Sequence, residues 1–271
     1  MIKIAKIKYL ILRRITQVAI IVLYLGANIW GWNFLTGNLS SSKLMGTISL
    51  SDPFAVLQIA SAGALLTIDL VSGALIVLIF YALIGGRAFC SWVCPVNIIT
   101  DAANYLRRVL RLEQVQRKEA ISRNIRYWGV GLAVIISAIT GVTAFEFVSP
   151  VGMVHRGLVF GMGFGWAAIV VIFLFDLFVL KNGWCGHLCP LGGFYSAVGK
   201  YSIFRVEHNS DKCTACMKCK VVCPESQVLW MVAKESKVVR SGECTNCARC
   251  IEVCDDDALN FSITNFLRRD K

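Results

Sequence analysis

The residues best able to do chemistry in this chain are its cysteines, which number twelve in 271 positions. Eight of them form two runs of equal spacing. In each run three cysteines are separated by two residues, and a fourth follows after three more. The runs are Cys213, Cys216, Cys219 and Cys223, then Cys244, Cys247, Cys250 and Cys254. This is the ligand spacing of proteins that carry two [4Fe–4S] clusters, which transfer single electrons.

In such pairs of runs the fourth cysteine binds the cluster of the other run. The spacing therefore predicts one cluster on Cys213, Cys216, Cys219 and Cys254, and another on Cys244, Cys247, Cys250 and Cys223. A zinc site would instead show separated Cys-x-x-Cys pairs. So many thiolate ligands also indicate a reducing compartment, which places this part of the chain in the cytoplasm.

The rest of the chain must position these cysteines, and its composition is that of a membrane protein. Hydrophobic residues make up 56% of the sequence, and the formal charge is +11. Four apolar stretches, 15–35, 69–88, 127–147 and 161–180, are each close to the ~20 residues needed to cross a bilayer. The basic residues flank these stretches, so we expect lipid and not nucleic acid as their partner.

The basic residues also predict the orientation of the spans. With Arg87, at the edge of its span, added to the 89–126 segment, Lys and Arg number 5, 1, 8, 1 and 13 in the successive segments between and around the four spans, which places both termini in the cytoplasm. We therefore expect a multi-pass protein of the bacterial inner membrane. The basic residues of 101–126, from Arg107 to Arg126, predict a basic helix on the inner leaflet. The short apolar stretch 53–68, with Asp52 as N-cap of a helix beginning at Pro53, predicts a re-entrant or interfacial helix.

These observations predict a chain of two domains. Residues 1–200 form an all-α polytopic membrane domain with four transmembrane helices in two pseudo-repeats. Residues 201–271, where charges of both signs replace the apolar runs, form a small α+β domain with two [4Fe–4S] clusters.

The pseudo-repeats each end in the same motif, aromatic-Cys-x-x-x-Cys-Pro-aliphatic, hereafter CxxxCP. It occurs at Phe89–Val96 and at Trp184–Leu191, so its cysteines are Cys90, Cys94, Cys185 and Cys189. The proline predicts a turn followed by a new helix. Three interpretations remain open: an additional iron centre, a pair of redox-active dithiols, or buried structural thiols.

Ionisable residues at membrane depth are costly and usually functional. Asp69, Glu146 and Asp176 are the acidic candidates within or at the ends of the spans. His155 with Glu146 forms one candidate pair of proton acceptors at the outer face. Asp176 is the candidate at the inner face, near the CxxxCP motifs.

Taken together, the four spans, the CxxxCP motifs and the two cluster motifs resemble the NapH-type ferredoxin-like quinol dehydrogenase membrane subunits, over nearly the whole chain. The superfamily also includes MauN, NosR and CcoG. The resemblance implies electron transfer from the membrane quinone pool, with a NapG-like periplasmic iron–sulfur partner, toward a periplasmic nitrate reductase. The second cluster motif departs from the pattern only in having Asp255 where the first has a proline. The alternative function is a membrane ferredoxin that reduces a metal or thiol during assembly of a respiratory enzyme.

Overall fold

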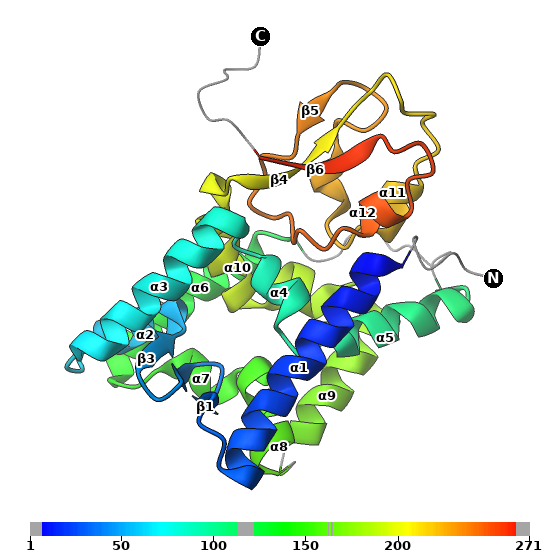
Figure 1. The fold of residues 1–271 in the computed structure, drawn as a ribbon. Helices are drawn as coiled ribbons and strands as arrows, with labels where there is room; N and C mark the ends of the chain where they lie inside the picture. The colour runs from blue at the N-terminus through cyan, green and yellow to red at the C-terminus, as the bar shows by residue number, and fades with distance from the viewer. Residues whose placement is uncertain (1–6, 113–121, 162, 164, 264–271) are drawn as a thin grey trace. The chain divides into compact units, whose positions relative to one another are not determined.

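A computed structural model describes residues 7–112, 122–161, 163 and 165–263 of the chain (Figure 1). The chain forms two compact units. The cysteine-rich unit comprises Met1–Thr16, Phe80–Val93 and Tyr195–Lys271, and the helical unit comprises Gln17–Ile79 and Cys94–Phe194. The cysteine-rich unit thus includes segments from well before residue 201.

The elements up to the second CxxxCP motif are mostly helical. They are α1 (Lys8–Trp30), β1 (Leu35–Gly37), β2 (Ser41–Leu44), β3 (Ile48–Ser51), α2 (Pro53–Ser61), α3 (Ile68–Ile84), α4 (Ala88–Trp92), α5 (Val96–Val109), α6 (Ile125–Thr140), α7 (Ala144–Val148), α8 (Pro150–Phe160), α9 (Gly165–Leu174) and two π-helical turns, η3 (Phe175–Val179) and η4 (Trp184–Leu188).

The remaining elements are short. They are α10 (Pro190–Val198), η5 (Gly199–Tyr201), β4 (Phe204–His208), α11 (Lys218–Val222), η6 (Ser226–Leu229), β5 (Lys237–Val238), α12 (Arg249–Glu252) and β6 (Leu259–Ile263).

Each predicted span overlaps a helix: α1 has 23 residues and begins before its apolar stretch, whereas the helices in the other three stretches are shorter than predicted. Within the described residues α1 alone is long and apolar enough to cross a membrane, whereas α3, α6 and the helix Gly165–Val179 are apolar and shorter. Helix α6 ends early because Gly141 takes a left-handed conformation as its C-cap. The predicted start of α2 is confirmed: Pro53 is its first residue, and Asp52 accepts a hydrogen bond from the N–H of Phe54.

The prediction that residues 1–200 are all-α is wrong at one place. Strands β1, β2 and β3 form a three-stranded antiparallel meander in the helical unit. Its second turn places Met45 and Gly46 at positive φ, which allows a tight reversal. The sequence around β2 is a short run of mostly polar residues. It does not show the alternation of apolar and polar side chains that indicates a strand, so no sheet was predicted here.

The predicted basic surface helix is also corrected. Arg107, on α5, is buried and donates from Nη1 to the carbonyl oxygens of Asp176 and Leu177. Arg126, on α6, is buried as well and donates to the carbonyl oxygen of Gly186 at 2.9 Å. Both arginines therefore satisfy carbonyls left without helical partners near the π turns, rather than facing lipid headgroups. Residues 113–121 of the predicted basic helix lie outside the described part of the chain.

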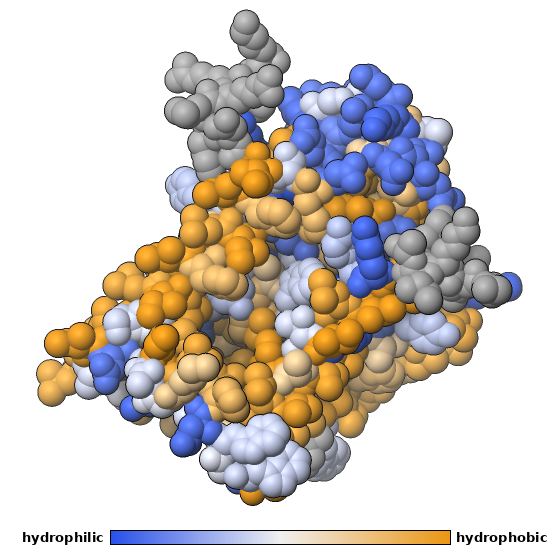
Figure 2. All heavy atoms as spheres, viewed as in Figure 1, coloured by the Kyte–Doolittle hydropathy of each residue, from blue (hydrophilic) through white to orange (hydrophobic). Residues whose placement is uncertain are grey.

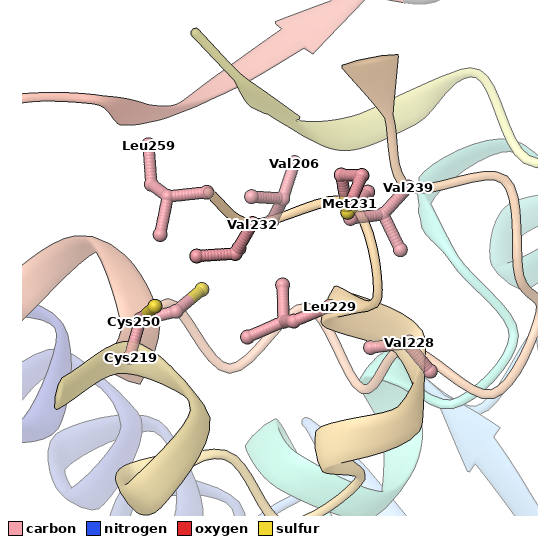
Figure 3. Close-up of a cluster of buried hydrophobic side chains, with 9 residues drawn as sticks. All are labelled: Val206, Cys219, Val228, Leu229, Met231, Val232, Val239, Cys250 and Leu259. Carbon is pink, nitrogen blue, oxygen red and sulfur yellow. The ribbon is translucent and has the colours of Figure 1, made fainter. Parts of the chain in front are cut away.

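The core of the cysteine-rich unit lies beneath a small antiparallel sheet of order β5-β4-β6. Figure 3 shows its buried side chains, which include Val206, Leu229, Met231 and Leu259 as well as two of the motif cysteines, Cys219 and Cys250. An apolar core this small gives limited stability, so the unit depends on the groups that its cysteines hold.

The helical unit packs around α2. Phe54 is fully buried against Phe145 and Phe194, with ring centroids 5.6 and 5.3 Å away. Gln58, one turn further on, is also fully buried, and its Oε1 accepts a hydrogen bond from the N–H of Phe145 at 2.9 Å. Helix α2 is thus a core element of this unit.

Candidate iron–sulfur and electron-transfer site

Two cavities in the cysteine-rich unit gather the eight motif cysteines. One cavity is lined by Cys213, Cys216, Cys219 and Cys254, and the other by Cys223, Cys244, Cys247 and Cys250. We call these the outer and the inner cysteine sets, respectively, because Cys216 of the first is exposed whereas Cys247 and Cys250 of the second are buried. Each set draws three cysteines from one run and one from the other, which is the grouping that the spacing predicts.

The backbone of each Cys-x-x-Cys-x-x-Cys loop is bent in the same way. Ala215 and Met217 in the first loop have φ of 56° and 60°, and Asn246 and Ala248 at the equivalent positions of the second have 48° and 60°. Non-glycine residues rarely adopt positive φ, and such strain is concentrated at functional sites. The bends let three cysteines of one loop line a single cavity.

The thiols of these sets are poorly suited to ionise by themselves. Burial raises the pKa of Cys244 to about 11 and also raises the pKa values of Cys219 and Cys250, and the neighbouring cysteines add to the effect. A cationic iron–sulfur core between the sulfurs would reverse this preference, because bound cations stabilise thiolates. Among the described residues, no group of three or more His, Cys, Asp or Glu side chains converges closely enough to hold a single metal ion. Each cavity offers four cysteine sulfurs, which is the donor set of a [4Fe–4S] cluster.

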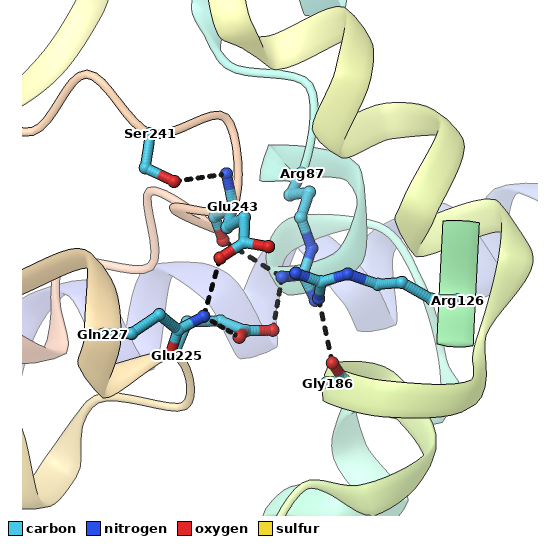
Figure 4. A network of polar contacts seen from close by, with 7 residues as sticks. All are labelled: Arg87, Arg126, Gly186, Glu225, Gln227, Ser241 and Glu243. Atoms are coloured by element: carbon cyan, nitrogen blue, oxygen red, sulfur yellow. Dashed lines mark hydrogen bonds and ion pairs between the residues drawn. The ribbon is translucent and has the colours of Figure 1, made fainter. Parts of the chain in front are cut away.

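A buried ion pair lies beside the inner set. Figure 4 shows Arg87 between Glu225 and the backbone of Glu243. Arg87 and Glu225 form a salt bridge, and both side chains are 1% exposed. Gln227 donates to both glutamates, at 2.7 Å to Glu225 and 2.8 Å to Glu243. Glu225 also lines the cavity of the inner set, so the network borders the place where a cluster would be held.

Each CxxxCP motif leads directly into a helix, as its proline predicts. Helix α5 begins at Val96 after Pro95, and α10 begins at Pro190. Cys94 and Cys189 are buried, Cys90 and Cys185 are half-buried, and none of the twelve cysteines forms a disulfide. The second motif forms the π turn η4, a geometry that is frequent at functional sites.

Asp176 is the most deeply buried of the candidate proton acceptors, with 0% exposure. Its Oδ1 accepts a hydrogen bond from the N–H of Trp184 at 2.9 Å, and its Oδ2 has no hydrogen-bond partner among the described residues. Trp184 begins the turn that carries Cys185. The structure therefore joins Asp176 to the second CxxxCP motif.

His155 and Glu146 are not joined by a hydrogen bond. His155 is buried on α8, with its ring 4.7 Å from that of Tyr24, and neither ring nitrogen has a hydrogen-bond partner in the described part of the chain. Burial and the charge of Arg156 lower the pKa of His155 to about 4. Glu146 instead accepts a hydrogen bond from the hydroxyl of Ser40 at 2.7 Å.

Several residues around these sites could not be predicted from the sequence. Arg87, Ser91 and Trp92 lie within or beside the first CxxxCP motif, and all three donate to the backbone of the Cys244 loop. Their role was missed because the partners lie more than 150 positions away in the sequence. One sequence feature does distinguish them: the second copy of the motif has different residues at these three positions.

Comparison with known protein families agrees with this arrangement. A family model described as a 4Fe-4S dicluster domain matches residues 205–255. A second model, described as a 4Fe-4S binding domain, matches the chain twice, over residues 66–113 and 159–206. Each of these two segments contains one CxxxCP motif, so the internal repeat has a counterpart in known families. No solved structure matches the chain.

Curated relatives match most of the chain. The methylamine utilization ferredoxin-type protein MauN of Paracoccus denitrificans is 42% identical over 239 residues, which cover 87% of this chain and 83% of the relative. The ferredoxin-type protein NapH of Escherichia coli is 43% identical over 223 residues, covering 82% of this chain and 77% of the relative. This chain therefore belongs to the family of NapH and MauN ferredoxin-type proteins, and it is an iron–sulfur electron-transfer protein.

Proposed function

We propose that the chain is a multi-pass membrane component of a quinol dehydrogenase, which takes electrons from membrane quinol and passes them to a redox partner. The observation that carries the proposal is the pair of cavities, each lined by four cysteines, in a chain with extensive apolar helices. Clusters bound there would supply one-electron carriers. We assign Cys213, Cys216, Cys219 and Cys254 as ligands of one, and Cys223, Cys244, Cys247 and Cys250 as ligands of the other.

The exposed surfaces of the helices support membrane insertion. Figure 2 shows hydrophobic side chains over α1 and α3 and hydrophilic ones over the C-terminal segment with the motif cysteines. Large apolar side chains such as Ile15 on α1, Ile79 on α3 and Val171 on α9 are more than half exposed, which in water would be costly. We place the four spans on α1, α3, α6 and α9 in a 1–200 membrane domain, with the termini and the 201–271 domain in the cytoplasm, following the distribution of Lys and Arg.

Oxidation of a quinol to a quinone releases two electrons and two protons, so the site needs proton acceptors as well as an electron path. Asp176 is the candidate with the strongest structural support, because its Oδ2 is buried without a hydrogen-bond partner among the described residues and its Oδ1 accepts from the turn carrying Cys185. His155 and Glu146 are the corresponding candidates for the outer face. The CxxxCP cysteines, Cys90, Cys94, Cys185 and Cys189, would carry electrons between quinol and the inner set, as redox-active thiols or as ligands of an additional iron centre.

We infer that the redox partner is a NapG-like iron–sulfur protein of a periplasmic nitrate reductase system. The similarity to NapH supports this inference. The chain is equally similar to MauN, whose name refers to methylamine utilization. Deletion of the gene tests which system the chain serves: loss of periplasmic nitrate reduction would support the nitrate reductase system, and loss of methylamine oxidation would support the other.

Anaerobic reduction of the purified, detergent-solubilised protein by a soluble quinol tests the proposal. We expect the quinol to reduce the protein and to produce the EPR signals of reduced clusters without any added protein. Dithionite serves as the control for total reducible cluster. Signals that develop with dithionite but not with quinols of any tested potential would contradict a quinol dehydrogenase role.

A further inference from the structure

The segment Arg87–Trp92, which contains Cys90, is hydrogen-bonded to the loop that carries two cysteines of the inner set. Arg87 Nη1 donates to the carbonyl oxygen of Glu243 at 3.0 Å. Ser91 Oγ donates to that of Thr245 at 2.7 Å, and Trp92 Nε1 to that of Asn246 at 3.1 Å. Three side chains within six residues thus hold the backbone around Cys244 and immediately before Cys247.

The loop returns a contact to the same part of the chain. Asn246 Nδ2 donates to the carbonyl oxygens of Ile84 and Phe204, at 2.7 and 3.0 Å. A Cβ atom on Gly86 would clash with the carbonyl oxygen of Tyr195, so glycine is needed for the backbones to approach this closely. The 84–92 segment is therefore packed into the cysteine-rich unit.

Arg87 reaches the opposite side of the inner set as well. Its salt bridge to Glu225 fixes the chain two residues after Cys223, the ligand that the first run would contribute to this set. One arginine consequently contacts both chain segments that build the inner cavity.

The outer set is held differently. Thr214, between Cys213 and Cys216, donates from its N–H and its hydroxyl to Asp256 Oδ2, and Lys218 forms a salt bridge with Asp255. Thr214, Lys218 and Asp255 are exposed and Asp256 is half-buried, and all four lie within or directly after the cluster motifs. The hydrogen bonds of the 84–92 segment described above go to the loop of the inner set and to Glu225.

The second copy of the CxxxCP motif lacks all three donors. Aligned on the cysteines, Asn182 stands at the position of Arg87, Gly186 at that of Ser91 and His187 at that of Trp92. Two of these residues have partners within the helical unit: Asn182 accepts from Asn104 Nδ2 at 2.6 Å, and the carbonyl of Gly186 accepts from Arg126. The two copies of a duplicated motif have therefore diverged at the positions that contact the cluster loop.

We propose that Arg87, Ser91 and Trp92 are positioning residues that couple the first CxxxCP motif to the inner cysteine set, so that the inner set is the one that exchanges electrons with the membrane half of the chain. The proposal rests on the electron-transfer function proposed above. Nearby charges and hydrogen bonds set the potential of an iron–sulfur site. Removal of the positive charge of Arg87 makes the electrostatic potential at the inner set more negative, and this disfavours addition of an electron there.

Equilibrium redox titration monitored by EPR tests the coupling in the purified full chain. The two signals are assigned with the Cys216→Ser and Cys247→Ser variants. We expect Arg87→Met to shift the midpoint potential of the Cys247-dependent signal downward and Glu225→Gln to shift it upward. Arg87→Lys should stay close to wild type, and the Cys216-dependent signal should not move in any of these variants.

Arg107→Met is the matched control, because Arg107 is also a buried arginine and donates to the carbonyl oxygens of Asp176 and Leu177 in the helical unit. It should leave the potentials of both signals unchanged. An unshifted Cys247-dependent signal in Arg87→Met and Glu225→Gln, or an equal shift of both signals, would overturn the proposal. If Arg87→Met does not assemble, Glu225→Gln decides the question alone. The titration uses dithionite and mediators, so its outcome is independent of whether quinol is the donor.

Discussion

The N–H of Trp184 donates a hydrogen bond to Asp176 Oδ1 at 2.9 Å. This bond joins the two π turns, since Asp176 lies in η3 and Trp184 begins η4. The buried carboxylate of Asp176 is thereby hydrogen-bonded to the residue that precedes Cys185. Its other oxygen has no hydrogen-bond partner among the described residues. Such a carboxylate can take up a proton where electrons are withdrawn from a bound quinol.

Replacement of this carboxylate should slow quinol oxidation. Asp176→Asn keeps the acceptor for Trp184 but removes the proton acceptor, and general-base catalysis contributes on the order of 10²–10⁴-fold to such steps. We expect the rate of cluster reduction by quinol to fall by about 100-fold or more, while reduction by dithionite is unchanged. Asp69→Asn is the control, because Asp69 is an exposed acidic residue at the start of α3. Equal rates in wild type and Asp176→Asn would exclude Asp176 as the proton acceptor and leave His155 and Glu146 as the candidates.

Replacement of single cluster cysteines should reveal the crossed grouping. We expect Cys223→Ser to remove the same EPR signal as Cys247→Ser, and Cys254→Ser to remove the same signal as Cys213→Ser, because each cavity combines cysteines from both runs. Each variant should lose about half of the cluster iron when two four-iron clusters are present. Loss of the same signal in Cys223→Ser and Cys213→Ser would show that each run binds its own cluster.

The CxxxCP cysteines should matter for electron flow and not for the C-terminal clusters. We expect the protein with Ser at positions 90, 94, 185 and 189 to retain both clusters and to lose quinol-dependent reduction. Anaerobic iron and sulfide analysis of wild type and of this variant tests whether the four cysteines bind iron. Iron above the content of two four-iron clusters in wild type alone would identify an additional centre, and equal iron contents would favour redox-active thiols. Undiminished quinol turnover in the variant would show that the four thiols are structural.

The Arg87–Glu225 ion pair should be strongly coupled in stability. Removing one partner of a buried pair costs roughly 3–5 kcal/mol, because the other charge stays buried without compensation. Arg87→Met and Glu225→Gln should each lower the denaturant midpoint for loss of cluster absorbance, and the double variant should lose less than the sum of the two. The exposed pair Lys218–Asp255 is the reference. Lys218→Gln should leave the denaturant midpoint close to that of wild type, because exposed ion pairs contribute little to stability. Additive effects of Arg87→Met and Glu225→Gln would argue against the coupling.

Acid should destabilise the helical unit through His155. The folded-state pKa of this buried histidine is about 4, below the ordinary value of 6.5, so the unfolded chain binds the proton more tightly. Its contribution to stability is therefore present above pH 6.5 and decreases as pH falls toward 4, by about 3 kcal/mol in total. His155→Phe retains an aromatic ring against Tyr24 and should flatten this part of the stability–pH profile. A profile identical to that of wild type would exclude His155 as its source.

Local features of this protein could be predicted because their determinants lie within a few residues. The spacing of the two cysteine runs indicates which four cysteines line each cavity, since a tight loop presents cysteines two residues apart to one centre. Asp52 and Pro53 mark the start of α2, and Pro95 and Pro190 mark where the helices after the CxxxCP motifs begin. Hydrophobic stretches predicted the presence of α1, α3, α6 and α9 but not their ends, because the apolar residues continue past Gly141 and through the π turn after Leu174.

The tertiary structure decided which polar residues are buried and what they contact. Sequence alone does not separate Arg107 and Arg126, which satisfy buried carbonyls, from arginines on a surface, nor Asp176 from the exposed Asp69. Arg87 and Glu225 are 138 positions apart, and their pairing depends on the packing of a CxxxCP segment against the cluster loop. Such long-range contacts depend on the whole fold, whereas ligand spacing and helix caps depend on a few consecutive residues and can therefore be recognised in the sequence.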